Sequence, residues 1–396
     1  MKRKIALIAL LCTFPPMSTD MYLAALPIMV KEWQQPLSII NLTLVLFFVA
    51  YCFGMLIYGP LSDRYGRRPP LLAGLTIYTL ASVACALAPN ALGLIIARIL
   101  QGLGGAAAST VVFAICKDLF DGAVRQRVFV QLGVITAGAP ILAPIIGGWI
   151  IGLASWRWIF ALLTVFGLVS VCGVYAMEES LKERGNASVL EAFRGYFRLC
   201  GNIPFILLTL SFASTGLPLF AFLAASADIY ISRLGYDEHQ YGLFFAANAS
   251  AFLVAPLAFS RAVKRFSLRW LLPASYFGVL IFAACMVAAT LPPPYSLQKI
   301  LPPPYTLAVP MWLLTFSFSF GRPPGNNLIL EQVKKDVGAA SSMMVFLYFI
   351  TGALAMWVIS RDWADKIAVL GWLGLGGAAI TICGWFAARL WFGVRA

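Results

Sequence analysis

The amino-acid sequence predicts an all-α polytopic membrane protein with twelve transmembrane helices in two six-helix halves. Hydrophobic residues make up 61% of the chain and charged residues only 11%, whereas soluble domains contain roughly 25% charged residues. Apolar runs long enough to cross a bilayer, about 20 residues each, recur from one end of the chain to the other. The connections between these runs are short, so there is no room for a soluble catalytic domain.

The apolar runs divide the chain into an amino-terminal half (1–177), a cytoplasmic linker (178–203) and a carboxy-terminal half (204–396). Two similar six-helix halves are typical of transporters built from repeats, in which the binding site lies at the repeat interface near the middle of the membrane. The predicted spans are 5–27, 38–61, 70–88, 91–116, 127–153, 157–177, 204–232, 240–260, 270–291, 306–330, 338–360 and 367–390.

The lysine and arginine residues predict the orientation, because cytoplasmic loops carry an excess of them. If the amino terminus is cytoplasmic, most of the 29 lysines and arginines fall on the cytoplasmic side. Both termini are therefore predicted to be cytoplasmic. The net charge of +13 then reflects this topology and contact with the headgroups of the lipid bilayer, and we expect no nucleic-acid partner.

The first span carries a carboxylate, Asp20, near its outer end, in a helix that Pro15 and Pro16 loosen. Because burial disfavours the charged form of a carboxyl group, Asp20 is expected to be paired or protonated. Such a group can exchange protons with each side of the membrane in turn. We hypothesise that Asp20 carries the coupled proton and that Arg98 is its electrostatic partner. A static ion pair that holds the first and fourth spans together is the alternative.

The fourth span places Arg98 inside an apolar run. A charge at that depth costs about 2.5 kcal/mol or more on insertion scales, so Arg98 should face the protein interior or a water-filled cavity. Gln101, Gly105 and Ser109 follow at helical spacings of three and four and share its face. The pattern predicts a buried cation on a polar helix face.

The fifth span has a stripe of glycine, alanine and proline on one face, at positions 133, 137, 140, 144 and 148. Small residues let neighbouring helices approach closely, and prolines favour bending. A bend-prone helix face of small residues, next to a helix with a buried cation, indicates a membrane protein that changes conformation.

The loop after the second span reads Gly-Pro-Leu-Ser-Asp-Arg-Tyr-Gly-Arg-Arg over residues 59–68. It resembles the Gly-x-Leu-x-Asp-Arg-x-Gly-Arg-Arg/Lys signature of the major facilitator superfamily at every fixed position. A random basic loop would not place two glycines and an aspartate at these offsets. Arg98 with Gln101 and Gly102 resembles the fourth-helix motif of this superfamily, and the stretch 139–148 resembles the fifth-helix motif of its antiporters.

Three further stretches, 16–27, 117–120 and 156–160, resemble the Bcr/CflA drug-resistance exporters of the same superfamily. The resemblance covers most of the first half strongly and the second half weakly. It implies the major facilitator fold and proton-coupled export across a bacterial inner (cytoplasmic) membrane. The expected partners are protons and a small-molecule substrate, and we expect a monomer.

The resemblance also implies a mechanical role for the loop 59–68. Asp63 would brace the start of the eleventh span, where a helix N-terminus favours negative charge, and Arg67 would pair with Asp118. These contacts would lock the outward-open state and break when the protein opens inward; topology and lipid contact alone are the alternative. The predicted gating residues are Gly59, Asp63, Arg64, Gly66, Arg67, Arg68, Asp118, Pro140, Pro144, Gly147 and Gly148.

Two charged residues depart from the family pattern. Asp228, near the outer end of the seventh span, stands where the family usually has a Ser-Pro pair. It could bind a basic substrate group or a second proton, or be hydrated at the rim. Arg322 interrupts the tenth span and either reaches lipid headgroups or meets an anionic substrate. The predicted proton-coupling residues are Asp20, Arg98, Gln101 and Asp228.

Candidate substrate contacts are polar residues within spans and aromatic or methionine residues at helical offsets. Polar side chains in a span can also hydrogen-bond a neighbouring helix, and apolar stripes also pack helix on helix. The predicted substrate-binding residues are Phe14, Met17, Tyr22, Asn41, Gln131, Asn248, Asn327, Met343 and Phe346.

Missing motifs narrow the possible functions. No Gly-x-x-x-x-Gly-Lys loop occurs, so nothing indicates ATP as the energy source. The single histidine, His239, has no companion ligands for a metal, and we expect no metal, no cofactor and no enzymatic activity. A channel would need an unbroken polar pore, which the sequence lacks. We therefore predict proton-coupled efflux of small amphipathic drugs; export of an endogenous metabolite, such as a siderophore or amino-acid derivative, and uptake remain open.

Overall fold

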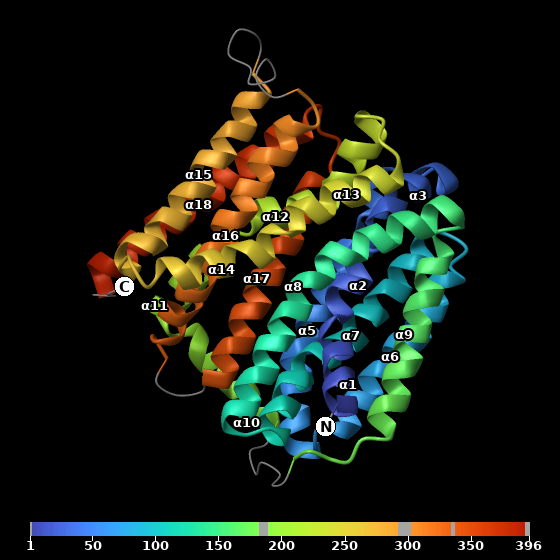
Figure 1. Ribbon diagram of the computed structural model, residues 1–396, viewed down its shortest axis with the longest axis vertical. Helices are drawn as coiled ribbons and strands as arrows, with labels where there is room; N and C mark the ends of the chain where they lie inside the picture. The colour runs from blue at the N-terminus through green and yellow to red at the C-terminus, as the bar shows by residue number, and fades with distance from the viewer. Residues whose placement is uncertain (1, 182–188, 292–301, 334–336, 393–396) are drawn as a thin grey trace. The chain divides into compact units, whose positions relative to one another are not determined.

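The computed structural model describes residues 2–181, 189–291, 302–333 and 337–392, and these residues are helical apart from turns and short connections (Figure 1). The chain forms two compact units, Met1–Arg194 (unit 1) and Gly195–Ala396 (unit 2). Helix α10 (Val189–Cys200) crosses the boundary between them. Each unit is described by itself below.

Unit 1 contains the first six predicted spans, some of them as several shorter helices. They are, in chain order, α1 (Lys2–Cys12), α2 (Phe14–Asp20), η1 (Leu23–Ala25), α3 (Leu26–Trp33), α4 (Leu37–Ile40), α5 (Leu42–Tyr65), α6 (Arg68–Ala86), α7 (Ala91–Leu119), α8 (Gly122–Leu153) and α9 (Arg157–Tyr175).

Unit 2 contains the remaining helices, with η2 as a short π-helical segment. They are α11 (Ile203–Ser214), α12 (Leu217–Ala227), η2 (Asp228–Arg233), α13 (Glu238–Ala249), α14 (Ala251–Ala262), α15 (Leu268–Ala289), α16 (Tyr305–Leu330), α17 (Val337–Ile359) and α18 (Lys366–Phe392).

Eleven helical stretches among the described residues are long and apolar enough to cross a membrane. The remaining predicted span, 306–330, which is the tenth in the chain, is present as α16, a helix of 26 residues. It falls outside the set of eleven because Arg322, two asparagines and three prolines make it less apolar. The fold class predicted from the sequence, an all-α polytopic membrane protein, is confirmed.

The first span is not the single loosened helix that the sequence predicts, because it is interrupted twice. Pro15 and Pro16 occupy the first positions of α2, and Pro27 one of the first two positions of α3. Proline is tolerated there because the first N–H groups of a helix have no partner within it. The seventh span is likewise divided at Gly216, with Pro218 at the start of α12.

Helix α7 forms the centre of unit 1 and packs between α5 and α6, with α9 on the far side of α6 (Figure 1). Many of its buried residues are small: Gly102, Gly104, Gly105 and Ala106–Ala108 are all buried. Small side chains let helix backbones approach closely. This close packing holds the first turns of α7, which carry Arg98, against α5 and the interrupted first span.

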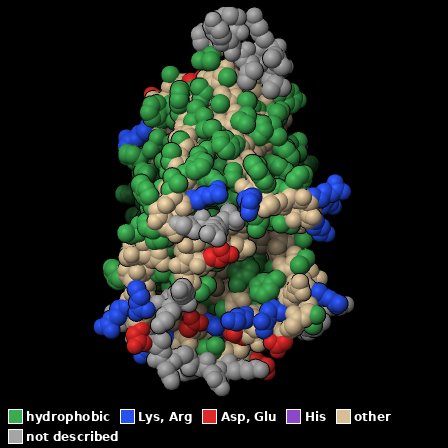
Figure 2. Space-filling model, turned by 90° about the vertical axis from the view of Figure 1, so that its left-hand side faces the viewer, with side chains coloured by type: hydrophobic (Ala, Val, Ile, Leu, Met, Phe, Trp, Pro, Cys, Tyr) green, Lys and Arg blue, Asp and Glu red, His purple; other side chains and the backbone are tan. Residues whose placement is uncertain are grey.

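The outside of the protein is strongly apolar. Figure 2 shows one face that hydrophobic side chains largely cover, while charged side chains gather mainly in its lower part. Leu80, Leu153 and Leu390 are 66%, 82% and 77% exposed. Surface of this kind is stable against lipid hydrocarbon, where helices satisfy their own backbone hydrogen bonds. The protein is therefore a multi-pass membrane protein.

Candidate coupling and gating sites

Arg98 is completely buried in unit 1, and its hydrogen bonds go to uncharged oxygens. Its Nη1 donates to the carbonyl oxygen of Ser18 at 2.9 Å and to Oε1 of Gln101 at 2.5 Å. Its Nε donates to the carbonyl oxygen of Thr43 at 3.3 Å. Ser18 lies in the last turn of α2, where helix carbonyls lack a partner within the helix. The interruption of the first span thus supplies an acceptor for the buried cation.

Two aromatic rings flank the Arg98 guanidinium. Its central carbon lies 4.2 Å from the ring centroid of Phe47 and 4.5 Å from that of Tyr22. Cations are attracted to ring faces at such distances, most strongly when water is excluded. The Tyr22 hydroxyl in turn shares a hydrogen bond of 2.9 Å with Oγ1 of Thr43. The Nη2 atom of Arg98 is buried and has no hydrogen-bond partner among the described residues.

Gln101 extends this polar network to α6. Its Nε2 donates to Oγ of Ser82 at 2.8 Å, while its Oε1 accepts from Arg98. On the other side, Oγ of Ser18 and the Tyr78 hydroxyl share a hydrogen bond of 2.7 Å. The predicted partnership of Arg98 and Gln101 on one face of the fourth span is therefore present, and it joins α7 to α2, α5 and α6.

Asp20 is buried at the end of α2, but it is not in contact with Arg98. Its Oδ1 accepts a hydrogen bond of 2.7 Å from Oγ1 of Thr19. The described residues contain no ion pair that includes Asp20, so the alternative of a static ion pair with Arg98 is absent from this conformation. The reason is the end of α2, where the Ser18 carbonyl reaches the guanidinium and the Asp20 carboxyl does not. Arg98 as the electrostatic partner of Asp20 stays a prediction. A role for Asp20 in proton coupling remains a prediction.

Arg67 organises the opposite end of unit 1. Its Nε donates to Oδ2 of Asp118 at 2.9 Å, and its Nη1 donates to Oγ of Ser62 at 3.0 Å and pairs with Asp63. The Arg67–Asp118 contact that the family resemblance implies is therefore confirmed. The predicted contact of Asp63 with the start of the eleventh span joins the two units and stays a prediction, as does the gating role of the whole cluster.

Glu179, just after α9, completes this cluster and was not predicted. The connection between α5 and α6 turns at Gly66, whose φ of 98° favours glycine. The turn directs the backbone N–H groups of Arg67 and Arg68 to the Glu179 carboxylate, at 2.9 and 3.1 Å. Burial alone would raise the pKa of Glu179, but these donors and those of Leu181 and Ser180 outweigh it and hold the pKa below its usual value.

The other predicted gating residues of this loop lie around the Arg67 cluster. Arg68 donates from Nη2 to the carbonyl oxygen of Tyr175 at 2.5 Å, which ties the start of α6 to the end of α9. Arg64 is exposed, and its guanidinium lies 5.5 Å from the ring of Tyr65. Gly59 is in the final turns of α5. An acidic residue directly after an apolar span, next to a glycine-containing loop, is the signal that could have identified Glu179.

Helix α8 remains continuous through Pro140 and Pro144, although the sequence predicts a bend-prone seam. Pro144, Gly147 and Gly148 are buried and Pro140 is half-buried. A Cβ atom on Gly147 would collide with the carbonyl group of Met21, so α8 lies directly against the backbone of the interrupted first span. This close contact lies at Gly147, beside the predicted stripe, while Gly133 of the stripe itself is exposed and has no neighbour that a Cβ atom would meet. A part of α8 in gating stays a prediction.

A second unpredicted cluster ties α3 to α9. Oε2 of Glu32 accepts from Nε1 of Trp156 at 2.7 Å, and Oε1 accepts from Nη1 of Arg157 at 2.9 Å. Arg157 also donates to the carbonyl oxygen of Ala88 at 3.3 Å. The stretch 156–160, which carries the resemblance to drug exporters, thus holds the end of the interrupted first span in place.

In unit 2, Asp228 is part of an ion-pair cluster. Its Oδ2 lies 2.9 Å from Nζ of Lys366, whose side chain is 5% exposed, and 3.3 Å from Nε of Arg233. Arg233 also donates to the carbonyl oxygens of Trp363 and Ala364, at 2.9 and 2.8 Å. The cluster ties η2 to the start of α18. Asp228 is thus already paired, and a part in proton coupling stays a prediction.

Several predicted substrate contacts take part in packing or in hydrogen bonds within a unit. Phe14 packs against Tyr78 and Phe166, with ring centroids 4.7 and 4.9 Å apart. Asn248 is buried and accepts a hydrogen bond of 3.1 Å from Thr315. Of the others, Tyr22, Asn41 and Met343 are buried, Met17 and Phe346 are half-buried, and Gln131 and Asn327 are exposed.

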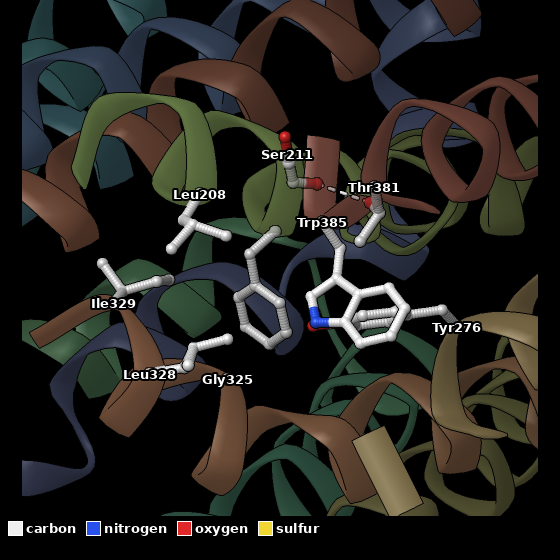
Figure 3. A pocket seen from close by; sticks show the side chains of 9 residues that line it. Leu208, Ser211, Tyr276, Gly325, Leu328, Ile329, Thr381 and Trp385 are labelled. Atoms are coloured by element: carbon white, nitrogen blue, oxygen red, sulfur yellow. Dashed lines mark hydrogen bonds between the residues drawn. The ribbon is translucent and has the colours of Figure 1, made fainter. Parts of the chain in front are cut away.

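Three cavities lie among the described residues of unit 2. The one in Figure 3, which Tyr276 and Trp385 line together with Ser211 and Thr381, has a free volume of about 10 Å³. That is no more than one water molecule needs, so it is a packing gap. A cavity of about 230 Å³ includes Asn327, and a third of about 140 Å³ includes Arg322.

Comparison with known proteins agrees with this architecture. A family model described as Major Facilitator Superfamily matches residues 8–356. The chain is 25% identical over 372 residues to the multidrug transporter MdfA of Yersinia pestis, covering 90% of this chain and 89% of that protein. It is 29% identical over 390 residues to a bicyclomycin resistance protein homolog of Haemophilus influenzae, covering 96% and 93%. A solved D-xylose-proton symporter has the same fold, with a TM-score of 0.72 and 16% identity over 96% of each chain.

Proposed function

Because the chain belongs to the major facilitator superfamily and is therefore a membrane transporter rather than an enzyme, we propose that it exports small amphipathic drugs in exchange for protons. Relatives at 25–29% identity are named for multidrug transport and bicyclomycin resistance. The drug substrate and the outward direction rest on these relatives and on the fifth-helix motif. The proton as driving ion rests on the chemistry of unit 1.

The observation that carries the proton-coupling proposal is the separation of Asp20 from Arg98. Asp20 is 7% exposed and its carboxyl accepts from Thr19, while Arg98 donates to two carbonyl oxygens and to Gln101. A carboxylate without a cation is costly to bury. Asp20 therefore takes up a proton when it is enclosed and releases it when water reaches it, and Arg98 keeps its hydrogen bonds in both states.

The proton gradient supplies sufficient energy for drug export. One proton moving through 100 mV yields about 2.3 kcal/mol. At about 1.4 kcal/mol per factor of ten, this sustains roughly a fortyfold concentration ratio of drug against the cell. No nucleotide is needed.

The location in the membrane follows from the same proposal. Most lysines and arginines fall on one side when both termini are placed in the cytoplasm. We place the protein in a bacterial inner membrane in this orientation, with the Arg67 cluster on the cytoplasmic side. Alternating access then exposes Asp20 to each side of the membrane in turn.

The test is substrate-induced proton release from purified protein in proteoliposomes with an enclosed pH-sensitive dye, screened over a panel of drugs. We expect at least one drug to change the internal pH and to be accumulated in proportion to the imposed pH gradient. Drug movement that continues at full speed after all ionic gradients are collapsed, or that requires ATP, would exclude the proposal. Metabolite analysis of the medium of a deletion strain tests whether an endogenous compound is the cargo instead.

A further inference from the structure

Unit 2 contains a cavity of about 140 Å³ between α11, α16 and α17. Helix α16 contributes Phe318, Arg322 and Asn326, which follow at intervals of four and therefore share one helix face. Polar groups from the other two helices, Thr209 of α11 and Ser341 of α17, also line it. The rest of the lining is apolar, which is the usual composition of a small-molecule site.

Arg322 lines this cavity and is an exposed residue, and its hydrogen-bonding groups are unused. Its guanidinium carbon lies 5.2 Å from the ring centroid of Tyr348 and 6.0 Å from that of Phe318. Within the described part of the chain, Arg322 forms no ion pair and no hydrogen bond, and the side-chain amide of Asn326, one turn along the helix, has no hydrogen bond either. None of the described lining residues is acidic. The cavity thus has a positive charge and N–H donors without an anion.

The aromatic wall of the cavity is fixed in place. The Tyr348 ring stacks on Phe318, with centroids 6.0 Å apart and planes at 13°, and meets Phe220 edge-on at 5.0 Å. A Cβ atom on Gly216, at the interruption of the seventh span, would crowd the Tyr348 ring. The glycine therefore leaves room for the ring, which is held as a flat surface beside the cation.

We propose that this cavity binds an aromatic carboxylate, with the carboxylate on Arg322 and Asn326 and the ring against Tyr348 and the apolar wall. A guanidinium presents parallel N–H donors that match the two oxygens of a carboxylate. A cavity of about 150 Å³ is large enough for one benzene ring. That such a compound is transported rests on the proposed function; that it binds does not.

The position of Arg322 argues against a purely lipid-facing role. It lies eight residues before Leu330, the end of α16, which is about 12 Å at the helical rise of about 1.5 Å per residue. Its guanidinium lies over Tyr348 of the neighbouring helix α17. A lipid phosphate is the other anion that could reach the site, and the experiment separates the two.

The test measures binding of radiolabelled benzoate to the purified full-length protein in detergent, without any gradient, with benzamide as the uncharged competitor of the same shape. Arg322→Gln should weaken benzoate binding by about tenfold or more, since a hydrogen bond to a charged group is lost. Arg322→Lys keeps the charge but not the paired donors, so its affinity for benzoate should lie between those of the wild type and Arg322→Gln. Benzamide should compete about tenfold less well than benzoate.

Arg361→Gln is the matched control, because Arg361 is an exposed cation of unit 2 that also lies over a ring, 4.2 Å from the centroid of Trp357. It should leave benzoate binding unchanged. Equal binding of benzoate and benzamide, no detectable benzoate binding, or full binding by a folded Arg322→Gln protein would overturn the proposal. Displacement of benzoate by phosphatidylglycerol in an Arg322-dependent way would also overturn it and assign the site to a lipid.

The outcome is distinguishable from failure of the proposed function. If proton-coupled transport is absent but benzoate binds through Arg322, only the transport mechanism is refuted. If transport of other drugs is proton-coupled but benzoate does not bind, only this site assignment is refuted.

Discussion

The guanidinium of Arg98 donates to the main-chain oxygen of Ser18 at 2.9 Å, two residues before the carboxyl of Asp20. The cation thus contacts the backbone of the first span and forms no ion pair with the carboxyl group of that span, which accepts from Thr19. The three hydrogen bonds of Arg98 and its two flanking rings involve no atom of the Asp20 side chain. This separation of a fixed charge from a variable one underlies the first two predictions.

Asp20→Asn is expected to uncouple transport from the pH gradient. The asparagine has nearly the same shape and still accepts from Thr19, but it cannot carry a proton. The roughly fortyfold accumulation that 100 mV can support should fall to equilibration, while drug affinity in detergent stays within about threefold, a difference under 1 kcal/mol. The measurement is drug accumulation in proteoliposomes at a series of imposed pH gradients. Asp362→Asn, at an exposed carboxylate, should behave as wild type, and gradient-driven accumulation by Asp20→Asn would rule out the carrier role.

Arg98→Lys is expected to lower both stability and transport although it conserves the charge. A lysine ammonium cannot reproduce the planar fit between Phe47 and Tyr22 together with three acceptors. Loss of one or two hydrogen bonds to a charged group costs about 2–4 kcal/mol. Thermal unfolding followed by size-exclusion fluorescence should show a clearly lower Tm. Arg125→Lys, at a partly exposed ion pair with Asp121, is the comparison, and equal stability of the two variants would contradict the prediction.

Asp118→Asn is expected to weaken the Arg67 cluster and to shift the balance between outward-open and inward-open states. The Asp118 side chain is 17% exposed and its partner Arg67 is 10% exposed, so little water replaces the lost charge. A shift of about tenfold in the conformational equilibrium corresponds to about 1.4 kcal/mol. This shift in the conformational equilibrium is measured as a change in the labelling rate of a cysteine introduced on the outer side of the membrane.

The matched control is Asp121→Asn, a few residues further along the chain. Asp121 also pairs with an arginine, Arg125, but its side chain is 93% exposed, and exposed ion pairs contribute little. The control should leave the labelling rate unchanged. If both variants shift it equally, the effect is not specific to the cluster.

Glu179→Gln is expected to destabilise the junction between the loop 59–68 and α9 in a pH-dependent way. Because backbone donors hold the pKa of Glu179 below its ordinary value of 4.5, its contribution is present in full above that value and is lost as the pH falls through the lowered pKa. The difference in thermal stability between wild type and variant should therefore be largest near neutral pH and shrink in acid. Glu178→Gln, at the adjacent exposed residue, should show no difference, and a difference that is constant with pH would be inconsistent with the proposed cause.

Asp228→Asn separates a structural role for this residue from proton coupling. It leaves the buried ammonium of Lys366 without its close carboxylate, and removing one partner of a buried pair costs several kcal/mol, about 3–5 at full burial. The double variant Asp228→Asn/Lys366→Met should recover most of the lost stability and retain gradient-driven transport. Loss of coupling in a stable double variant would instead assign Asp228 to the proton pathway.

Some of the fold could be predicted from the sequence because it depends on features that are local in the chain. Apolar runs mark the spans whichever helices they contact. The contact of Arg67 with Asp118, 51 residues apart, was implied by the family resemblance of the loop 59–68. The face shared by Arg98 and Gln101 follows from helical periodicity alone. The spans and this shared face needed no knowledge of which helices are neighbours.

Other features depend on how helices pack and could not be read from the chain. The end of α2 decides that Ser18, and not Asp20, meets Arg98. Glu179 reaches the backbone of Arg67 only because α9 ends beside the start of α6. The cavity at Arg322 needs faces from three helices, and periodicity identifies each face but does not predict which faces meet. For this reason Asn327 was predicted as a substrate contact, whereas its neighbour Asn326 lines the Arg322 cavity.

The contact of Gly147 with the carbonyl group of Met21 has a consequence for how this protein can evolve. The contact there is between two stretches of main chain, so its geometry does not depend on which side chains surround it. One added methyl group at position 147 would push α8 away from the first span. The least replaceable position in unit 1 can therefore be a residue that carries no chemistry at all.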